Sequence, residues 1–285
     1  ESLGFSYDNL IRFKKVINRP NGIVLVTGPT GSGKNTTLYA ALAELSSEQV
    51  NICTVEDPVE CNIHGINQFE VHEMAGFTFA SALRSLLRQD PDIIMVGEIR
   101  DRETANIAVQ AALTGHLVLS TLHTNDAPSS VTRMVNIGLE PYLIAASLNA
   151  VLAQRLVRRI CNHCKEPFNP PDNLRKYMEI GHIEPHEMMI GKGCEKCRNS
   201  GYAGRCGIHE LLIVDDNFRE IINTDASVNS MRQAFRRSGW PSLFEDGLTK
   251  VKRGITSIEE VLRVSQAEGL DPAAFSHNAC EGSVA

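Results

Sequence analysis

The stretch that decides the fold is Ile23-Val24-Leu25-Val26-Thr27-Gly28-Pro29-Thr30-Gly31-Ser32-Gly33-Lys34. Its apolar half is typical of a buried strand, and residues 36–42 after it are typical of a helix. The GxxxxGK spacing between them is that of a phosphate-binding loop: the glycines let backbone N–H groups face a β-phosphate, and Lys34 reaches the β and γ oxygens. A glycine turn without a ligand is the weaker interpretation, because the motif stands between a strand and a helix. The sequence therefore predicts a nucleotide site.

The position after this lysine departs from the usual motif. A Ser or Thr hydroxyl normally ligates Mg²⁺ there, and this chain has Asn35. The amide oxygen of Asn35 can serve as a metal ligand but is a bulkier, weaker substitute, and Thr36 comes one position too late. The sequence thus predicts binding more firmly than hydrolysis. The candidate nucleotide-binding residues are Gly28, Pro29, Thr30, Gly31, Ser32, Gly33, Lys34, Asn35 and Thr36.

The bulk composition is that of an ordinary globular chain. The 285 residues suggest about two domains, and 42% hydrophobic with 22% charged residues is enough for a buried core. A net charge of −6 and a pI near 5.9 argue against broad nucleic-acid binding. No apolar run approaches the roughly 18 residues of a membrane span, and no signal-peptide pattern is present. Because the chain begins with Glu1, we expect it to be a piece of a longer protein.

Four short apolar runs alternate with helical stretches, at residues 23–26, 52–55, 93–96 and 117–122. This alternation predicts an α/β fold with a mostly parallel sheet and helices on both faces. In such sheets ligands bind outside the carboxyl ends of the strands. We therefore expect the polar residues that follow the four runs to gather at the phosphate loop.

Acids follow two of these runs. Glu98 comes after the strand that begins at Asp92, an arrangement that resembles a Walker B segment with Glu in place of the commoner Asp. Glu56, Asp57 and Glu60 follow the second run. Each acid could be a solvated strand end, but next to a phosphate loop a metal-orienting or water-polarising role is favoured. Glu60 ranks ahead of Glu56 as the general base, although the sequence does not separate the two.

Two histidines border the fourth run. His123 ends it, where an imidazole can contact the γ-phosphate and respond to its loss, whereas His116 begins it and has a structural role as its equal alternative. Arg84, Arg88 and Arg100 are weaker candidates for contacts to phosphate or to a neighbouring subunit, with surface salt bridges as the alternative. The candidate catalytic residues are Glu60, Glu56, Glu98, Lys34 and His123.

Eight cysteines include two CxxC pairs, Cys161 with Cys164 and Cys194 with Cys197. Each CxxC turn can hold one metal through two thiolates, so two turns predict a closed tetrahedral S₄ zinc site of structural type. Redox chemistry is the competing interpretation, and two matched pairs make it the weaker one. The 29 residues between the pairs predict a small separate lobe.

These patterns predict five regions in chain order. They are a lead-in helix and linker (1–20), the P-loop core (21–156), the tetracysteine zinc lobe (157–208), a helical C-terminal subdomain (209–270) and a flexible tail (271–285).

Several long motifs occur together in one order: the phosphate loop, TVEDPVE at 54–60, LRQDPDIIMVGEIRD at 87–101, TGHLVLSTLHTN at 114–125, and the two CxxC pairs. From about residue 3 to 267 this chain resembles the bacterial type II secretion ATPases, also called general secretory pathway protein E, and the type IV pilus assembly ATPases. The resemblance implies a RecA-like P-loop core with an Asp box (54–60), a Walker B segment (92–98), a His box (116–123) and a zinc lobe. It also implies ATP, Mg²⁺ and structural Zn²⁺ as ligands.

The resemblance further implies a homo-hexameric motor on the cytoplasmic side of the inner membrane, docked on a secretion or pilus platform. The zinc pairs argue against the pilus retraction ATPases, and the insert length favours type II secretion over pilus extension. The family's N-terminal domains, which carry trans-acting arginines and the platform-binding surface, are missing here, so we expect slow hydrolysis. The alternatives are a nucleic-acid translocase, a nucleotide-binding scaffold impaired by Asn35, and, least of all, a zinc-only module; no nucleic-acid partner is expected.

Overall fold

The structure is a computed structural model that describes residues 3–265. The chain forms two compact units. Unit 1 comprises Leu3–Gln154 and His209–Trp240, and unit 2 comprises Arg155–Ile208 and the described residues from Pro241 onward. The predicted tail, 271–285, lies outside the described residues. Within the described range, no helix combines the length and the apolarity needed to cross a bilayer.

The main sheet has seven strands in the order β3-β2-β4-β5-β1-β6-β9. The pairs from β3 through β6 are all parallel, so the carboxyl ends of β1, β2, β4 and β5 share one edge. The four predicted runs are all strands. The bounds are β1 (Gly22–Thr27), β2 (Ile52–Glu56), β3 (Asn67–Glu70), β4 (Ile93–Val96), β5 (Leu117–Leu122), β6 (Leu148–Ile160) and β9 (Tyr202–Ile213).

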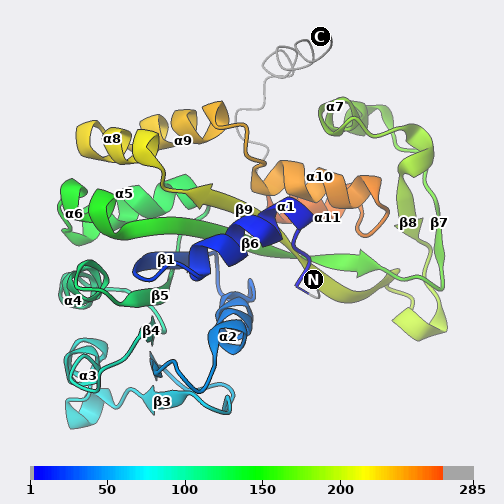
Figure 1. The fold of residues 1–285 in the computed structure, drawn as a ribbon. Coiled ribbons are helices and arrows are strands. Elements are labelled where there is room, and N and C mark those ends of the chain that lie inside the picture. The colour runs from blue at the N-terminus through cyan, green and yellow to red at the C-terminus, as the bar shows by residue number, and fades with distance from the viewer. Residues whose placement is uncertain (1–2, 266–285) are drawn as a thin grey trace. The chain divides into compact units, whose positions relative to one another are not determined.

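Helices cover both faces of the strands in unit 1, as the alternation predicts. Alternate strand residues, such as Val24, Met95 and Leu119, pack in one core cluster with side chains of α1 and α2. The residues between them, such as Leu25 and Ile94, are equally buried, on the face where α3 and α4 pack (Figure 1). The helices of unit 1 are α1 (Tyr7–Ile17), α2 (Lys34–Leu45), α3 (Phe79–Leu86), α4 (Arg102–Leu113), α5 (Ala127–Ile137), α6 (Pro141–Ser147), α8 (Asp216–Thr224) and α9 (Val228–Arg237).

Capping residues fix where the helices at the functional edge begin. Asp101 accepts the N–H of Thr104 to start α4, and Asp126 accepts the N–H of Ser129 to start α5. Each cap satisfies a backbone donor that the helix cannot, which stabilises the helix by about 1 kcal/mol. The caps at Asp101 and Asp126 therefore fix the backbone shortly after Glu98 and His123.

Unit 2 has its own small core. It contains a two-stranded antiparallel sheet, β7 (Lys165–Pro167) with β8 (Met189–Gly191), and the helices α7 (Asp172–Gly181), α10 (Leu243–Lys252) and α11 (Ile258–Val264). Leu174 and Met178 of α7 pack with Phe244 and Leu248 of α10 in one apolar cluster. The start of the predicted helical region, residues 209–213, is instead strand, because these residues continue β9 in the main sheet.

Candidate functional site

The phosphate loop closes tightly against the strand behind it. Gly33, at φ 85°, is the N-cap of α2, in a left-handed conformation that glycine adopts without strain. A Cβ on Gly28 would lie 2.5 Å from the carbonyl oxygen of Gln154 and 2.6 Å from Oγ of Ser32. No side chain fits there, so the loop geometry requires glycine at position 28, as the sequence motif does.

The loop itself holds the lysine of the motif. Nζ of Lys34 donates to the carbonyl oxygens of Gly28 at 2.9 Å and Pro29 at 3.1 Å, and the residue is only 8% exposed. Oγ of Ser32 is buried and has no hydrogen-bond partner among the described residues. A buried hydroxyl without a partner is costly, and a phosphate oxygen would supply the missing partner. The loop therefore fits a bound phosphate.

A glutamine that the sequence analysis did not select braces this loop. Nε2 of Gln154 donates to the carbonyl oxygen of Ser32 at 2.8 Å, and its Oε1 accepts from Thr37 Oγ1 at 2.7 Å. Gln154 thus joins the loop to the first turn of α2. Its place within β6 gave no signal, because a single polar residue in an apolar run has no motif around it.

Asn35 and Glu60 contact each other directly. Nδ2 of Asn35 donates to Oε1 of Glu60 at 2.7 Å, although 25 residues separate them. Among the described residues, nothing donates to the Asn35 amide oxygen. Amide oxygens are suitable Mg²⁺ ligands, so Asn35 beside the phosphate loop fits the metal that the motif implies, and its contact with Glu60 holds that carboxylate nearby.

Glu56 and Glu60 lie in different environments. Glu56 is 3% exposed. Its Oε1 accepts from Thr54 Oγ1 at 2.6 Å and from Gln68 Nε2 at 3.0 Å, and its Oε2 accepts a short hydrogen bond from the Tyr39 hydroxyl. Glu60 is exposed. Three donors already occupy the Glu56 carboxylate, whereas Glu60 remains accessible to water.

Glu98 and His123 meet at the ends of the neighbouring strands β4 and β5. The Glu98 carboxylate accepts a hydrogen bond from Arg100, and its Oε2 lies 3.5 Å from Nε2 of His123. Burial and the charge of Lys34 lower the pKa of His123, against the opposing effect of Glu98. The lowered pKa keeps the imidazole neutral at neutral pH, so it can donate or accept a hydrogen bond there.

The remaining candidates lie away from this group. His116 is at the amino end of β5, where its Nδ1 lies 2.9 Å from the carbonyl oxygen of Ala111. Arg84 pairs with Glu103 at the surface, and Arg88 is exposed.

Unit 2 brings the four cysteines of the CxxC pairs together. Their sulfurs all lie within 4.8 Å of one another, at 3.9 Å for Cys161 and Cys194, 3.8 Å for Cys164 and Cys197, and 3.7 Å for Cys194 and Cys197. Metal–sulfur bonds of 2.3 Å in a tetrahedron require sulfurs about 3.8 Å apart. The cluster therefore has the donor set and the spacing of a tetrathiolate metal site.

Backbone N–H groups support the sulfurs. Gly193 donates to Cys164 Sγ at 3.3 Å, and Cys194 donates to Cys197 Sγ at 3.2 Å. Burial raises the pKa of Cys197, but N–H groups of Cys194 and Gly201 outweigh it and lower the value to about 6. Burial raises the pKa of Cys164 to about 12. Because metals bind thiolates, N–H donors of this kind favour the bound form.

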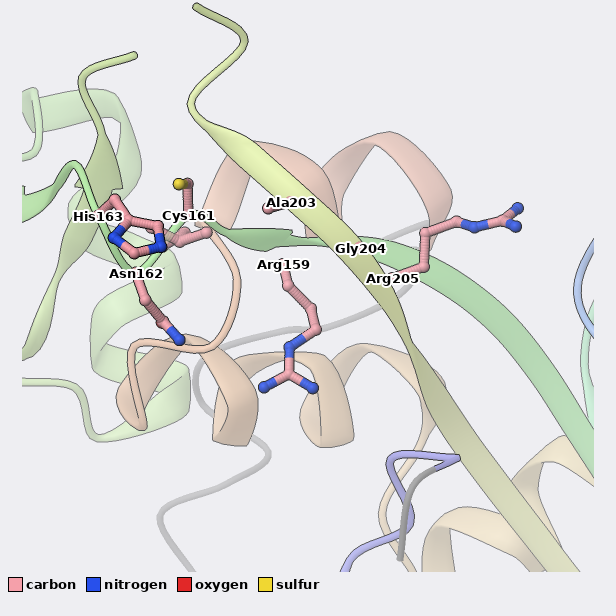
Figure 2. Close-up of a pocket in the computed structure, with 8 residues that line it drawn as sticks. Arg159, Cys161, Asn162, His163, Ala203, Gly204 and Arg205 are labelled. Atoms are coloured by element: carbon pink, nitrogen blue, oxygen red, sulfur yellow. The ribbon is translucent and has the colours of Figure 1, made fainter. Parts of the chain in front are cut away.

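A cavity of about 370 Å³ lies beside this cluster, lined in part by Arg159, Asn162, His163 and Arg205. Figure 2 shows that these side chains spread away from one another instead of converging. The cavity is basic, but it does not present a common binding point.

Sequence reasoning missed three residues that order the acidic segment: Tyr39, Thr54 and Gln68. One signal was available for Tyr39, because it follows Asn35 by four positions and so lies on the same face of α2. Thr54 and Gln68 stand on adjacent strands, where only the register of β2 with β3 brings them together.

Comparisons with known proteins place this chain in a family. The family described as "Type II/IV secretion system protein" matches residues 1–263. The chain is 55% identical over 265 residues to the type II secretion system ATPase E of Vibrio cholerae, covering 93% of this chain and 52% of the relative. It is 53% identical over 264 residues to the type IV pilus assembly ATPase PilB of Thermus thermophilus, covering 92% of this chain and 30% of that relative. The chain thus spans about half or less of the length of these relatives.

Solved structures agree with the sequence comparisons. The pilus retraction motor PilT, determined with bound ADP, superimposes with a TM-score of 0.70 at 29% identity, covering 95% of this chain and 67% of that one. The ATPase DotB of Legionella pneumophila gives 0.66 at 25% identity, covering 92% of this chain and 63% of that one. The expected fold, an α/β nucleotide-binding core with a tetracysteine cluster and C-terminal helices, is confirmed. This chain belongs to the type II/IV secretion system protein family.

Proposed function

We propose that this chain is the ATP-hydrolysing portion of a secretion or pilus motor. The observation that supports it is the meeting of four strand ends at one edge of the sheet. The phosphate loop after β1, Glu60 after β2, Glu98 after β4 and His123 after β5 lie there, and Asn35 and Glu60 are joined at 2.7 Å. The sequence relatives named as ATPases support the same activity.

Each of these residues has a role in that proposal. Lys34, the loop N–H groups and the Ser32 hydroxyl hold the phosphates of ATP. Asn35, and Glu98 through water, would hold Mg²⁺, which would supply positive charge to neutralise the phosphates. The Glu60 carboxylate orients the attacking water and accepts its proton, and His123 contacts the γ-phosphate edge. Positioning and electrostatics of this kind supply most of the rate in phosphoryl transfer.

The test compares ATP turnover of the chain with that of Glu60→Gln, and Glu48→Gln is the control because Glu48 is also exposed. We expect Glu60→Gln to lose on the order of 10²–10⁴-fold in turnover and Glu48→Gln to lose nothing. Equal turnover in all three proteins would refute the assignment of Glu60. Turnover that rises with added DNA or RNA would favour a nucleic-acid translocase instead.

Asn35 requires a test of its own. ATP affinity is measured for the chain and for Asn35→Ser, with and without Mg²⁺. Binding requires neither a ring nor residues of another subunit, so it reports on the metal position alone. Equal tightening by Mg²⁺ in both proteins supports the motor. Tightening only in the Ser variant would mean that Asn35 impairs the metal site and that the scaffold alternative holds.

For unit 2 we propose that Cys161, Cys164, Cys194 and Cys197 hold one structural Zn²⁺. All four coordination positions are sulfur, which leaves no open position for catalysis. Elemental analysis of the purified chain tests this, with about one zinc ion per chain expected.

The proposal extends to a homo-hexamer on the cytoplasmic side of the inner membrane that powers type II secretion, with its platform partners bound through segments outside this chain. Pilus extension is the alternative, because the relatives of both kinds are similarly close. The test replaces the matching segment of the Vibrio cholerae and Thermus thermophilus relatives with this chain. Restored secretion without restored piliation supports the first assignment, and the reverse result supports the second.

A further inference from the structure

The side chain of Tyr39 joins the two candidate glutamates. Its hydroxyl donates to the buried carboxylate of Glu56 and accepts the backbone N–H of Glu60 at 3.3 Å. One phenol can do both, because it has one donor and two acceptor sites. Burial, together with the hydrogen bond to Glu56, raises the pKa of Tyr39. The phenol therefore stays protonated, and its hydrogen remains directed at Glu56.

A second side chain holds the same segment from its other end. Nε2 of Gln68 donates both to Glu56 and to the carbonyl oxygen of Cys61, each at 3.0 Å, and its Oε1 accepts the N–H of Ile63 at 2.7 Å. Tyr39 and Gln68 therefore both connect Glu56 to the backbone of residues 60–63. The loop that carries Glu60 is fastened to the end of β2 through the carboxylate of Glu56.

Glu56 is thereby engaged on both oxygens. Thr54, Gln68 and Tyr39 all donate to it, and only 3% of the residue is exposed. A buried carboxylate with three donors is poorly accessible to water, whereas the carboxylate of the exposed Glu60 accepts, among the described residues, only from the Asn35 amide. The two acids that follow one strand are thus suited to different tasks.

We propose that Tyr39 is a positioning residue that sets Glu60 by tying its backbone N–H to the buried carboxylate of Glu56, which serves as an anchor and not as the base. This inference deepens the proposed function and rests on the role given there to Glu60. The sequence alone leaves open which of Glu56 and Glu60 is the base. In this proposal, their hydrogen-bond partners distinguish the two.

The first measurement compares kcat and the ATP dissociation constant in Tyr39→Phe, Glu56→Gln and Glu60→Gln, with Tyr7→Phe as the matched control because Tyr7 is 75% exposed. Tyr39→Phe keeps the ring and removes only the hydroxyl. We expect it to lower kcat on the order of 10- to 100-fold, the cost of a misplaced catalytic group, with unchanged ATP affinity. Glu56→Gln keeps hydrogen-bonding atoms at the anchor and should lose less than about tenfold, far less than Glu60→Gln.

The second measurement follows hydrogen exchange of the Glu60 amide, which requires no turnover. Tyr39→Phe should speed exchange at residue 60 while leaving β1 and β4 protected, a result that general destabilisation would not give. Unchanged exchange at residue 60, or a full kcat in Tyr39→Phe beside an impaired Glu60→Gln, overturns the role of Tyr39. A loss in Glu56→Gln as large as in Glu60→Gln overturns the anchor. Full activity of Glu60→Gln would instead refute the role that the proposed function gives to Glu60, and the exchange result would still decide whether Tyr39 holds the loop.

Discussion

The phosphate-loop edge of unit 1 and the cysteine cluster of unit 2 satisfy their polar groups in different ways. At the phosphate loop, Lys34 donates to carbonyl oxygens of its own loop, and Asn35 donates to the exposed Glu60. The buried hydroxyl of Ser32 has no hydrogen-bond partner among the described residues. In unit 2, four sulfurs lie at tetrahedral spacing with backbone N–H groups directed at two of them. The first arrangement can exchange these contacts for those of a ligand at little cost, whereas the second suits a ligand that stays.

Glu260 extends the contrast within unit 2. Its carboxylate is 2% exposed and accepts hydrogen bonds from the guanidinium groups of Arg158 and Arg263 and from the backbone N–H of Arg158. Among the described residues, no arginine pairs with the exposed Glu60 in this way. Glu260 is thus paired for stability, whereas the Glu60 carboxylate is left accessible for chemistry.

The largest effect should come from breaking the sulfur cluster. In Cys161→Ser we expect metal content to fall from about one ion per chain to none and unit 2 to unfold, because metal binding at such sites contributes about 10–16 kcal/mol to folding. Elemental analysis and limited proteolysis within residues 155–208 measure this. The exposed Cys61, outside the cluster, gives the control Cys61→Ser. Retention of metal and protease resistance in Cys161→Ser would contradict the contrast between the two sites.

A smaller effect is expected at Glu260. Burial raises the pKa of this residue, but the arginine hydrogen bonds outweigh it and bring the value to about 2 from an ordinary 4.5. Its stabilisation is therefore present above pH 4.5 and lost as pH falls towards 2. Glu260→Gln should cost on the order of 2 kcal/mol at pH 7, after screening of the half-exposed arginines. Amide exchange in α11 during denaturation measures this loss of stability, and Glu259→Gln at the exposed neighbour is the control. A loss of stability that does not shrink with falling pH would contradict the prediction.

A substitution in the phosphate loop should change ATP affinity and leave the stability of the protein nearly unchanged. Lys34→Ala removes charge-assisted hydrogen bonds of about 1.5–3 kcal/mol, so ATP should bind roughly 10- to 100-fold more weakly. The unfolding midpoint should change little, since Lys34 rests on exchangeable loop carbonyls. Titration calorimetry and thermal unfolding test both points against Lys15→Ala, an exposed lysine of α1. Unchanged affinity would show that Lys34 stays on its own loop when ATP is bound.

The smallest effect concerns His123, whose pKa reports the charges at the strand ends. Lys34 lowers it and Glu98 raises it, so Lys34→Ala should raise the pKa and Glu98→Gln should lower it, each by less than about one unit. Because the folded pKa lies below 6.5, the contribution of His123 to stability is present above that pH and declines as pH falls through the folded pKa. NMR titration of the imidazole gives the direction, and shifts of the same sign in both variants would contradict this arrangement of charges.

Much of the parallel core could be predicted because its strands are short apolar runs, each followed by polar residues. β3 escaped prediction, since Asn67-Gln68-Phe69-Glu70 is largely exposed and has no apolar run. The beginning of β9, at residues 202–205, is likewise polar and exposed, and only its pairing partner makes it a strand.

The cysteine cluster was the most predictable part of the candidate sites, because CxxC spacing determines geometry locally. The acids were less so. Glu56 and Glu60 follow one strand and have the same chemistry, and their difference in exposure depends on Tyr39 and Gln68, which come from other elements. Likewise, a linear list of regions cannot express that residues 209–240 return to unit 1.

The interleaving of the two units has a consequence for the order in which the chain can fold during translation. Unit 1 requires His209–Trp240, so the ribosome must synthesise all of residues 155–208 before that unit can close. The core of unit 2 then waits for Phe244 and Leu248 of α10, although its four cysteines have already emerged within 37 residues of one another. Since domains generally form as their last segment leaves the ribosome, a metal captured early by residues 161–197 would hold the nascent chain together until both cores can be completed.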